Sequence, residues 1–221
     1  MASYSNKPQT IVFFDVEGTG LPLPTNIPKL TELCFLAVSR EDLVRRLVTP
    51  RVMNKLTLSF NPGKPLNDSA VEVSGLTNAD LQNSPTFEEQ VPILTLFLKH
   101  LPQPVCLVAH NGARYDFPLL ARQLEDAGVN ISNLENISCV DTIPIFQVMM
   151  PMRRYRLDEM YRQICGTSFS QKKHSAEDDC VKLMEIIRKK DSESFVKLCE
   201  KTSQPLHFFA LPEQFKNMFR K

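Results

Sequence analysis

The sequence predicts an α/β fold in which a five-stranded mixed sheet is flanked by helices. Three strand-like segments follow one another at the start of the chain, and strands then alternate with helices. Consecutive strands with short links tend to pair antiparallel, whereas strand–helix alternation is typical of parallel pairing, so the sheet is expected to be mixed. The 221 residues are 43% hydrophobic, which suits one domain with a sizeable core.

Each expected strand is an apolar run that turn residues end. The strands are expected at residues 10–17, 29–39, 55–61, 105–110 and 138–141. Residues 56–60 alternate apolar and polar side chains, which indicates a half-exposed strand. Helices are expected at residues 68–74, 77–81, 86–100, 116–128, 143–149, 157–165, 177–189 and 193–201. Thr86 and Glu89 have the spacing of a capping box, and Pro118 suits a first helical turn.

The amino-acid composition bears on the domain organisation and on the cellular compartment. We expect a polar N-terminal segment over residues 1–9, one domain over residues 10–203 and a C-terminal tail over residues 204–221. The six cysteines are widely spaced and several lie in apolar runs, which is typical of reduced thiols in a cytoplasmic or nuclear protein. The net charge of +1 points to no particular partner, and no run approaches the ~20 apolar residues that span a bilayer, so no membrane partner is expected.

The first strand carries two carboxylates, Asp15 and Glu17, before a Gly-Thr-Gly turn. Side chains two apart on a strand emerge on the same face, so these acids are expected side by side, with Phe14 and Val16 on the other face. Two adjacent acids at the end of a buried strand repel each other, and a hard divalent cation between them relieves this. The alternative is a solvated strand end with two incidental acids.

Two further aspartates are expected to point inward from helices. Asp116 shares a helical stripe with Leu119, Leu120 and Leu124, the face that should pack on the sheet. Asp179 lies on the apolar stripe of its helix, whereas Asp178 shares its stripe with Lys182, Glu185 and Lys189 and is expected to face solvent. An inward acid at a helix start is costly unless it is paired or binds metal.

A histidine, His174, stands five residues before Asp179. A histidine near a helix start is usually a plain loop residue. With an ordinary pKa of about 6.5, it is also the side chain best matched to accepting a proton from water near neutral pH.

Three separated motifs resemble the DEDDh 3′→5′ exonucleases, and in particular the three-prime repair exonuclease (TREX) family. The motifs are DVEGTGLP at residues 15–22, HNGARYDF at residues 110–117 and HSAEDD at residues 174–179, and the similarity extends over residues 10–190. The resemblance implies a ribonuclease H-like, DnaQ-like fold. The chain departs from the common family pattern at Gly18, where Ala is usual, and at Asp178, where Gly is usual.

The resemblance also implies roles for individual residues. The metal-binding acids would be Asp15, Glu17, Asp116 and Asp179, and His174 would be the general base. The substrate-binding residues would be Gly20, Leu21, Pro22, His110, Arg114 and Tyr115. Asp141 is interpreted as structural.

These residue types suit phosphodiester hydrolysis by two metal ions. Two divalent ions about 3.5–4 Å apart activate a water and stabilise the departing 3′-oxygen, and Mg²⁺ prefers carboxylate, water and phosphate oxygens. We expect two Mg²⁺ ions per site, with Mn²⁺ able to substitute, and DNA hydrolysis from a single-stranded or frayed 3′ end to nucleoside 5′-monophosphates. A 3′→5′ exoribonuclease and an inactive nucleic-acid-binding protein are the alternatives.

Two surface features suggest partners. Arg153, Arg154 and Arg156, with Lys172 and Lys173 nearby in sequence, form the best candidate for a strand-binding patch, although charged runs are often merely solvated surface. An unpaired sheet edge invites another strand. The resemblance implies a homodimer through the edge strand near residues 55–61.

Overall fold

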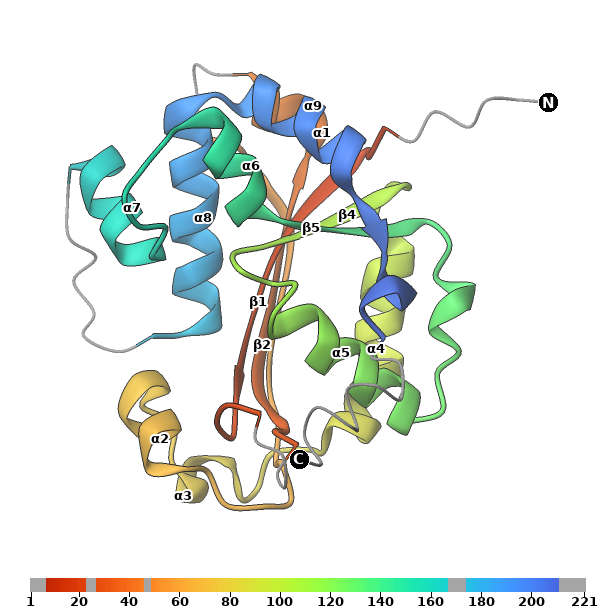
Figure 1. The fold of residues 1–221 in the computed structure, drawn as a ribbon. Coiled ribbons are helices and arrows are strands. Elements are labelled where there is room, and N and C mark those ends of the chain that lie inside the picture. Colours follow the sequence, from red (N-terminus) through yellow and green to blue (C-terminus); the bar gives the residue numbers. More distant parts are fainter. Residues whose placement is uncertain (1–6, 23–26, 46–48, 167–173, 211–221) are drawn as a thin grey trace.

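A six-stranded mixed sheet, in the order β3-β2-β1-β4-β5-β6, forms the centre of the molecule (Figure 1). The computed structural model describes residues 7–22, 27–45, 49–166 and 174–210. The strands are β1 (Thr10–Gly18), β2 (Leu30–Ser39), β3 (Val52–Ser59), β4 (Val105–Ala109), β5 (Ile137–Asp141) and β6 (Gln204–Pro205). The α-helices are α1 (Arg40–Val44), α2 (Asp68–Ser74), α3 (Asn78–Leu81), α4 (Phe87–His100), α5 (Asp116–Asp126), α6 (Thr142–Met149), α7 (Leu157–Cys165), α8 (Ala176–Lys190) and α9 (Ser192–Thr202).

The strand pairing confirms the predicted antiparallel start and parallel continuation. Strand β1 pairs antiparallel with β2 and parallel with β4, and β2 pairs antiparallel with β3. The sixth strand differs from the predicted count of five. It is only two residues long and pairs with β5 through Ser138 and Cys139, so it is too short to produce a periodic sequence signal.

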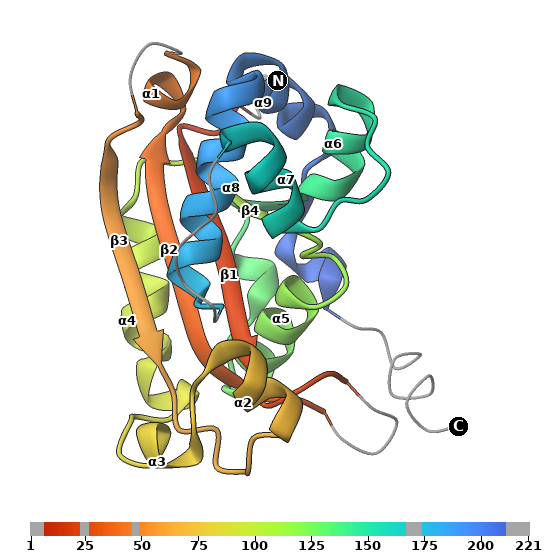
Figure 2. The same cartoon turned by 90° about the vertical axis from the view of Figure 1, so that its left-hand side faces the viewer.

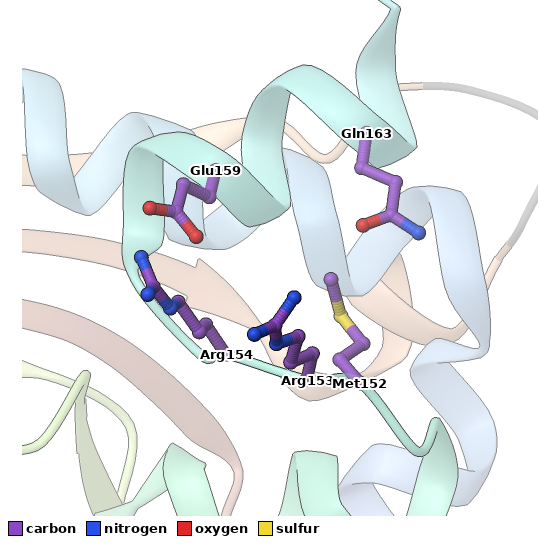
Figure 3. Close-up of a pocket in the computed structure, with 5 residues that line it drawn as sticks. All are labelled: Met152, Arg153, Arg154, Glu159 and Gln163. Carbon is purple, nitrogen blue, oxygen red and sulfur yellow. The ribbon is translucent and has the colours of Figure 1, made fainter.

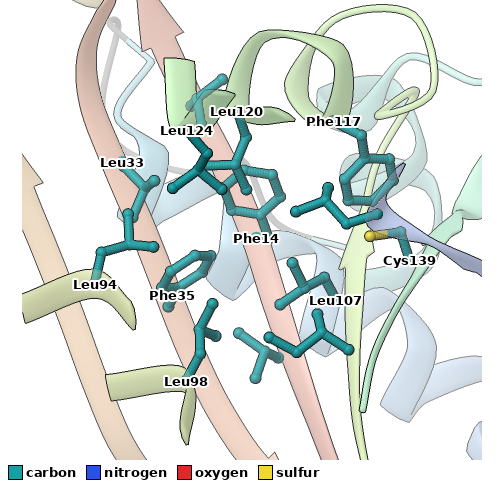
Figure 4. Close-up of a cluster of buried hydrophobic side chains, with 14 of the residues drawn as sticks. Phe14, Leu33, Phe35, Leu94, Leu98, Leu107, Phe117, Leu120, Leu124 and Cys139 are labelled. Atoms are coloured by element: carbon teal, nitrogen blue, oxygen red, sulfur yellow. The ribbon is translucent and has the colours of Figure 1, made fainter. Parts of the chain in front are cut away.

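Helices cover both faces of the sheet, and β1 contributes side chains to both. Val12 and Phe14 point to the face covered by α4 and α5, where Phe14 lies 5.2 Å from Phe35 and 5.8 Å from Phe117 between ring centroids (Figure 4). Ile11 and Phe13 point to the opposite face, against α8 and α9. Alternation along the strand therefore sends the next two side chains of this second face, at positions 15 and 17, toward α8.

Most predicted helices begin and end where local signals place them. Thr86 and Glu89 form the capping box at the start of α4, and α2 and α7 have the predicted bounds. The structure also contains α1 and two short 3₁₀ helices that the sequence does not predict, η1 (Ile131–Asn133) and η2 (Leu206–Phe209). These elements are short enough that their position depends on what they pack against.

The end of the described chain packs on the domain. Leu206 is 1% exposed in the core, and the Phe209 ring lies 4.9 Å from the Phe117 ring. The predicted tail thus contributes β6 and η2 up to residue 210, and residues 211–221 lie outside the described residues. The six cysteines carry free thiols. No helix in the described part of the chain is long and apolar enough to cross a bilayer.

Candidate active site

Two carboxylates project from one face of β1 near its C-terminal end. Asp15 and Glu17 face α8, and Val16 between them is 5% exposed in the opposite core, so the predicted same-face arrangement is confirmed. Burial, followed by repulsion from Asp116 and other carboxylates, raises the pKa of Asp15 well above its usual range. Burial and repulsion from Asp179 raise the pKa of Glu17 to about 7.

A third carboxylate, Asp116, is the first residue of α5 and is 5% exposed. Its Oδ1 accepts a hydrogen bond of 3.2 Å from the Val16 backbone N–H, which fixes it beside the β1 acids. The preceding loop is held by Asp141, whose carboxylate accepts from the N–H groups of Asn111, Ala113 and Ile143. Asp141 is therefore structural, as predicted. Burial raises the pKa of Asp116 to about 7 against the lowering effect of its hydrogen bonds.

The fourth carboxylate, Asp179, lies in the first turn of α8 and is 9% exposed. The start of this helix is fixed from two sides. Ser175 caps it by accepting from the Asp178 N–H, and Glu32 on β2 accepts a 2.8 Å hydrogen bond from the Ala176 N–H. Asp178 keeps some exposed surface, so the predicted difference between the two aspartates is confirmed.

The histidine, His174, contacts the fourth carboxylate. Its Nδ1 lies 2.9 Å from Asp179 Oδ2, and because a carboxylate only accepts, Nδ1–H donates. Its backbone N–H donates to Val73 O on α2 at 2.9 Å, so α2 also positions the residue. The hydrogen bond to Asp179 raises the pKa of His174 above its usual value.

A lysine that was expected to face solvent is part of the same cluster. Lys182 is 4% exposed, and its Nζ lies 2.7 Å from Asp179 Oδ1 and 2.7 Å from Asp158 Oδ1. The expectation that Lys182 faces solvent was wrong because α7 packs alongside α8 at this position (Figure 1), whereas Lys189 on the same stripe is exposed as expected. Burial acts to raise the pKa of Asp179, but hydrogen bonds from His174 and Lys182 outweigh it and hold this pKa below its usual value.

Three of the four acids offer the kind of ligand atoms that a hard divalent cation prefers. Asp15, Glu17 and Asp116 supply only oxygen, and each feels the negative charge of the neighbouring acids. In the described part of the chain, no lysine or arginine forms an ion pair with these three acids. Among the described residues, no three His, Cys, Asp or Glu side chains stand close enough to form a ready-made metal site.

The turn after β1 carries three candidate substrate-binding residues, Gly20, Leu21 and Pro22. Gly20 has a φ of 145°, and a Cβ there would lie 2.3 Å from Asn67 Nδ2, so this position requires glycine. Leu21 is 73% exposed and faces solvent at the tip of the turn. Tyr115, another candidate, donates from its hydroxyl to Gly20 O at 2.9 Å and so holds this turn.

The same tyrosine explains the departure at Gly18. A Cβ at position 18 would lie 2.2 Å from the Tyr115 hydroxyl oxygen. Burial raises the pKa of Tyr115 above its usual value, so the hydroxyl stays protonated and keeps donating to Gly20 O.

His110 has an internal role. Its Nε2 lies 2.6 Å from Tyr155 O, which can only accept, so Nε2 donates and Nδ1 accepts from the Thr142 hydroxyl at 2.8 Å. Both ring nitrogens are therefore used within the protein, and no ring nitrogen is left for the expected substrate contact. Arg114, by contrast, is exposed on the loop before α5.

The predicted basic patch lies on the segment between α6 and α7. Arg153 and Arg154 line a hollow of about 330 Å³ together with Met152, Glu159 and Gln163 (Figure 3). Arg156 is exposed, and its Nη1 lies 3.9 Å from Glu159 Oε1. Lys172 and Lys173 lie outside the described residues.

Three residues of the site were missed from the sequence: Glu32, Asp158 and Lys182. Glu32 stands opposite Glu17 in the β1–β2 register, so an acid in the second strand was the available signal. The sequence contains no signal for Lys182 or Asp158, because each lies on a helix face whose burial depends on how α7 packs against α8.

Known exonucleases resemble this chain in sequence. A family model described as exonuclease matches residues 12–187. Human three-prime repair exonuclease 1 is 39% identical over 200 residues, which cover 80% of this chain and 62% of the relative. Mouse three prime repair exonuclease 2 is 39% identical over 147 residues, 62% of this chain and 60% of the relative. The chain thus spans about three fifths of the length of these relatives.

The fold is shared with a solved nuclease structure. The nuclease domain of 3′hExo, described as a DEDDh family member bound to rAMP, matches with a TM-score of 0.65 and 16% identity. The match covers 92% of this chain and 98% of the other, which supports the ribonuclease H-like fold. The family model covers most of the chain, and the chain therefore belongs to the exonuclease family, with three-prime repair exonucleases among its relatives.

Proposed function

We propose that this protein is a metal-dependent 3′→5′ exodeoxyribonuclease that releases nucleoside 5′-monophosphates. The observation that carries the proposal is the convergence of Asp15, Glu17, Asp116 and Asp179, from three distant segments, on one end of β1 beside His174. Such a group of acids, three of them with raised pKa values, suits divalent cations better than a purely structural role.

When bound, two Mg²⁺ ions would supply charge neutralisation for the scissile phosphate and an activated water. The residues that would hold them are Asp15, Glu17, Asp116 and Asp179. His174 donates from Nδ1 to Asp179, and Nε2, which lies 3.5 Å from Asp158 Oδ2, would be the nitrogen that accepts a proton from the attacking water. The Gly20–Pro22 turn, with Tyr115 beneath it, offers a surface for the terminal nucleotide.

The test is a degradation assay on 3′-labelled single- and double-stranded DNA and on matched RNA, with and without Mg²⁺. We expect Mg²⁺-dependent release of mononucleotides from DNA. His174→Ala and Asp179→Ala should each reduce turnover by more than about 100-fold while leaving DNA binding intact. Asp178→Ala is the matched control, because it removes a neighbouring acid from the same turn.

Each outcome separates the candidate functions. Faster loss of the RNA substrate would favour the exoribonuclease, and unchanged binding with no turnover under any metal would favour the nucleic-acid-binding protein. If Asp179→Ala kept most of its activity, the role given to this carboxylate would be wrong.

We further propose that Arg153, Arg154 and Arg156 bind backbone phosphates of the substrate strand. The support is the exposed arginine pair lining a hollow of about 330 Å³. Substituting Arg153 and Arg154 with Ala should weaken binding across sequences and reduce its salt dependence. An unchanged salt slope would reject the patch.

A homodimer through β3 is part of the same proposal. Strand β3 is at one end of the sheet (Figure 2), and Val52 and Met53 on it are 37% and 36% exposed. An exposed edge with apolar side chains is suited to pairing with a second copy. Light scattering should give twice the chain mass, and Met53→Lys should shift it toward the monomer. A wild-type mass of one chain at working concentrations would contradict the dimer.

A further inference from the structure

The cation inside the acid cluster is Lys182, and its surroundings are unusual for a lysine. Its side chain is 5% exposed, and its ammonium lies 2.7 Å from Asp179 Oδ1 on its own helix. The same ammonium lies 2.7 Å from Asp158 Oδ1 on α7. A buried ammonium is unfavourable unless carboxylates surround it, so the pair of partners is what allows a lysine here.

Both carboxylate oxygens of Asp179, the fourth acid, already accept a hydrogen bond. Asp179 accepts from Lys182 at Oδ1 and from His174 at Oδ2. Asp15, Glu17 and Asp116 have no comparable cation in the described part of the chain. Asp179 is thus the one of the four acids whose charge is already neutralised, and an ammonium 2.7 Å from its oxygen repels a second cation.

Asp158, the second partner of Lys182, can keep the ammonium paired. Asp158 approaches Lys182 as closely as Asp179 does, its side chain on α7 is 46% exposed, and its other oxygen, Oδ2, lies 3.5 Å from His174 Nε2. If a metal ion took Asp179, Lys182 could keep its bond to Asp158 and would not become an unpaired buried charge.

We propose that Lys182 is a resident cation that neutralises Asp179 in the metal-free protein and competes with the divalent ion for it, and that Asp158 retains the ammonium when the ion binds. This inference rests on the proposed metal-dependent function. Lys182 acts here through Asp179 and is a positioning residue.

Competition predicts opposite effects for the two partners of one ion pair. Lys182→Met removes the competitor while keeping an unbranched side chain, so metal should bind on the order of tenfold more tightly. Asp158→Asn leaves Lys182 with Asp179 alone, so metal should bind several-fold more weakly. A purely structural ion pair would give weaker metal binding in both variants.

The double variant separates competition from simple loss of charge. With Lys182 replaced, Asp158 keeps only its 3.5 Å contact with His174 Nε2, between side chains that are 39% and 46% exposed, so adding Asp158→Asn to Lys182→Met should change metal affinity much less than Asp158→Asn does alone. If Asp158 acted only as a nearby negative charge, its loss would weaken binding equally in both backgrounds. Lys197→Met and Glu193→Gln are the charge-matched controls, because this exposed pair on α9 has a similar 2.8 Å contact.

The experiment uses Mn²⁺ as the probe and measures free Mn²⁺ by electron paramagnetic resonance in titrations of the metal-free protein, without DNA. The expected result is tighter binding for Lys182→Met, weaker binding for Asp158→Asn, and a double variant close to Lys182→Met. Circular dichroism establishes folding, and Lys182→Gln replaces the methionine variant if that one is unfolded.

The failures are distinguishable. Unchanged or weaker Mn²⁺ binding in Lys182→Met, with wild-type binding that Asp179→Ala abolishes, would overturn this inference and leave the proposed function standing. Absence of wild-type Mn²⁺ binding, or binding indifferent to Asp179→Ala, would overturn both.

Discussion

The charge on Glu17 should destabilise the metal-free protein, and its removal measures how much. Glu17 has a pKa of about 7 in the folded chain against 4.5 for an ordinary glutamate. Each pKa unit corresponds to about 1.36 kcal/mol, so ionised Glu17 costs about 3 kcal/mol once the pH is well above 7. We therefore expect Glu17→Gln to be more stable than the wild type at pH 8 in the presence of EDTA.

The ionisation of Glu17 makes the folding stability depend on pH. The folded pKa is the higher one, so the folded state holds the proton more tightly, and stability falls as the pH rises from about 4.5 through about 7. At pH 5 the unfolded glutamate is mostly ionised and the folded one is not, and the gain from Glu17→Gln should shrink to about 1 kcal/mol.

Urea unfolding followed by circular dichroism at pH 5 and pH 8 measures this difference. Glu72→Gln on α2 is the control, because Glu72 is exposed, and its effect should stay within about 0.5 kcal/mol at both pH values. Mg²⁺ should stabilise the wild type at pH 8, since it binds only the folded state, and should stabilise Glu17→Gln less. A variant no more stable than the wild type at pH 8 in EDTA would refute the electrostatic reasoning.

Three further variants test the packing around the site. Gly18→Ala should cost about 1–3 kcal/mol of unfolding free energy because its Cβ would lie 2.2 Å from the Tyr115 hydroxyl, and Tyr115→Phe should recover part of that loss in a double-mutant cycle. Phe14→Ala should cost about 3–5 kcal/mol in urea unfolding, because the ring is fully buried, and a loss below 1 kcal/mol would contradict the described core. Ser175→Ala should cost about 1 kcal/mol by removing the cap of α8, and an unchanged thermal midpoint would argue against that cap.

Local patterns in the sequence determined the order of elements and the directions of several acids. Period-two alternation placed Asp15 and Glu17 on one face of β1, and period-3.6 spacing placed Asp179 toward the core and Asp178 away from it. The Thr86 capping box fixed the start of α4. These features follow from backbone geometry within one element, so a sequence contains them without knowledge of its neighbours.

The tertiary structure decided which side chains the acids meet. Lys182 is buried because α7 packs over the stripe of α8 that carries it, and Glu32 reaches the Ala176 N–H because β2 lies under the start of α8. Glycine fits best at position 18 because Tyr115, 97 positions away along the chain, places its hydroxyl there. How separate elements pack decides which helix face is buried and which partner a charged side chain meets. The periodicity of residues within a single element carries no information about that packing.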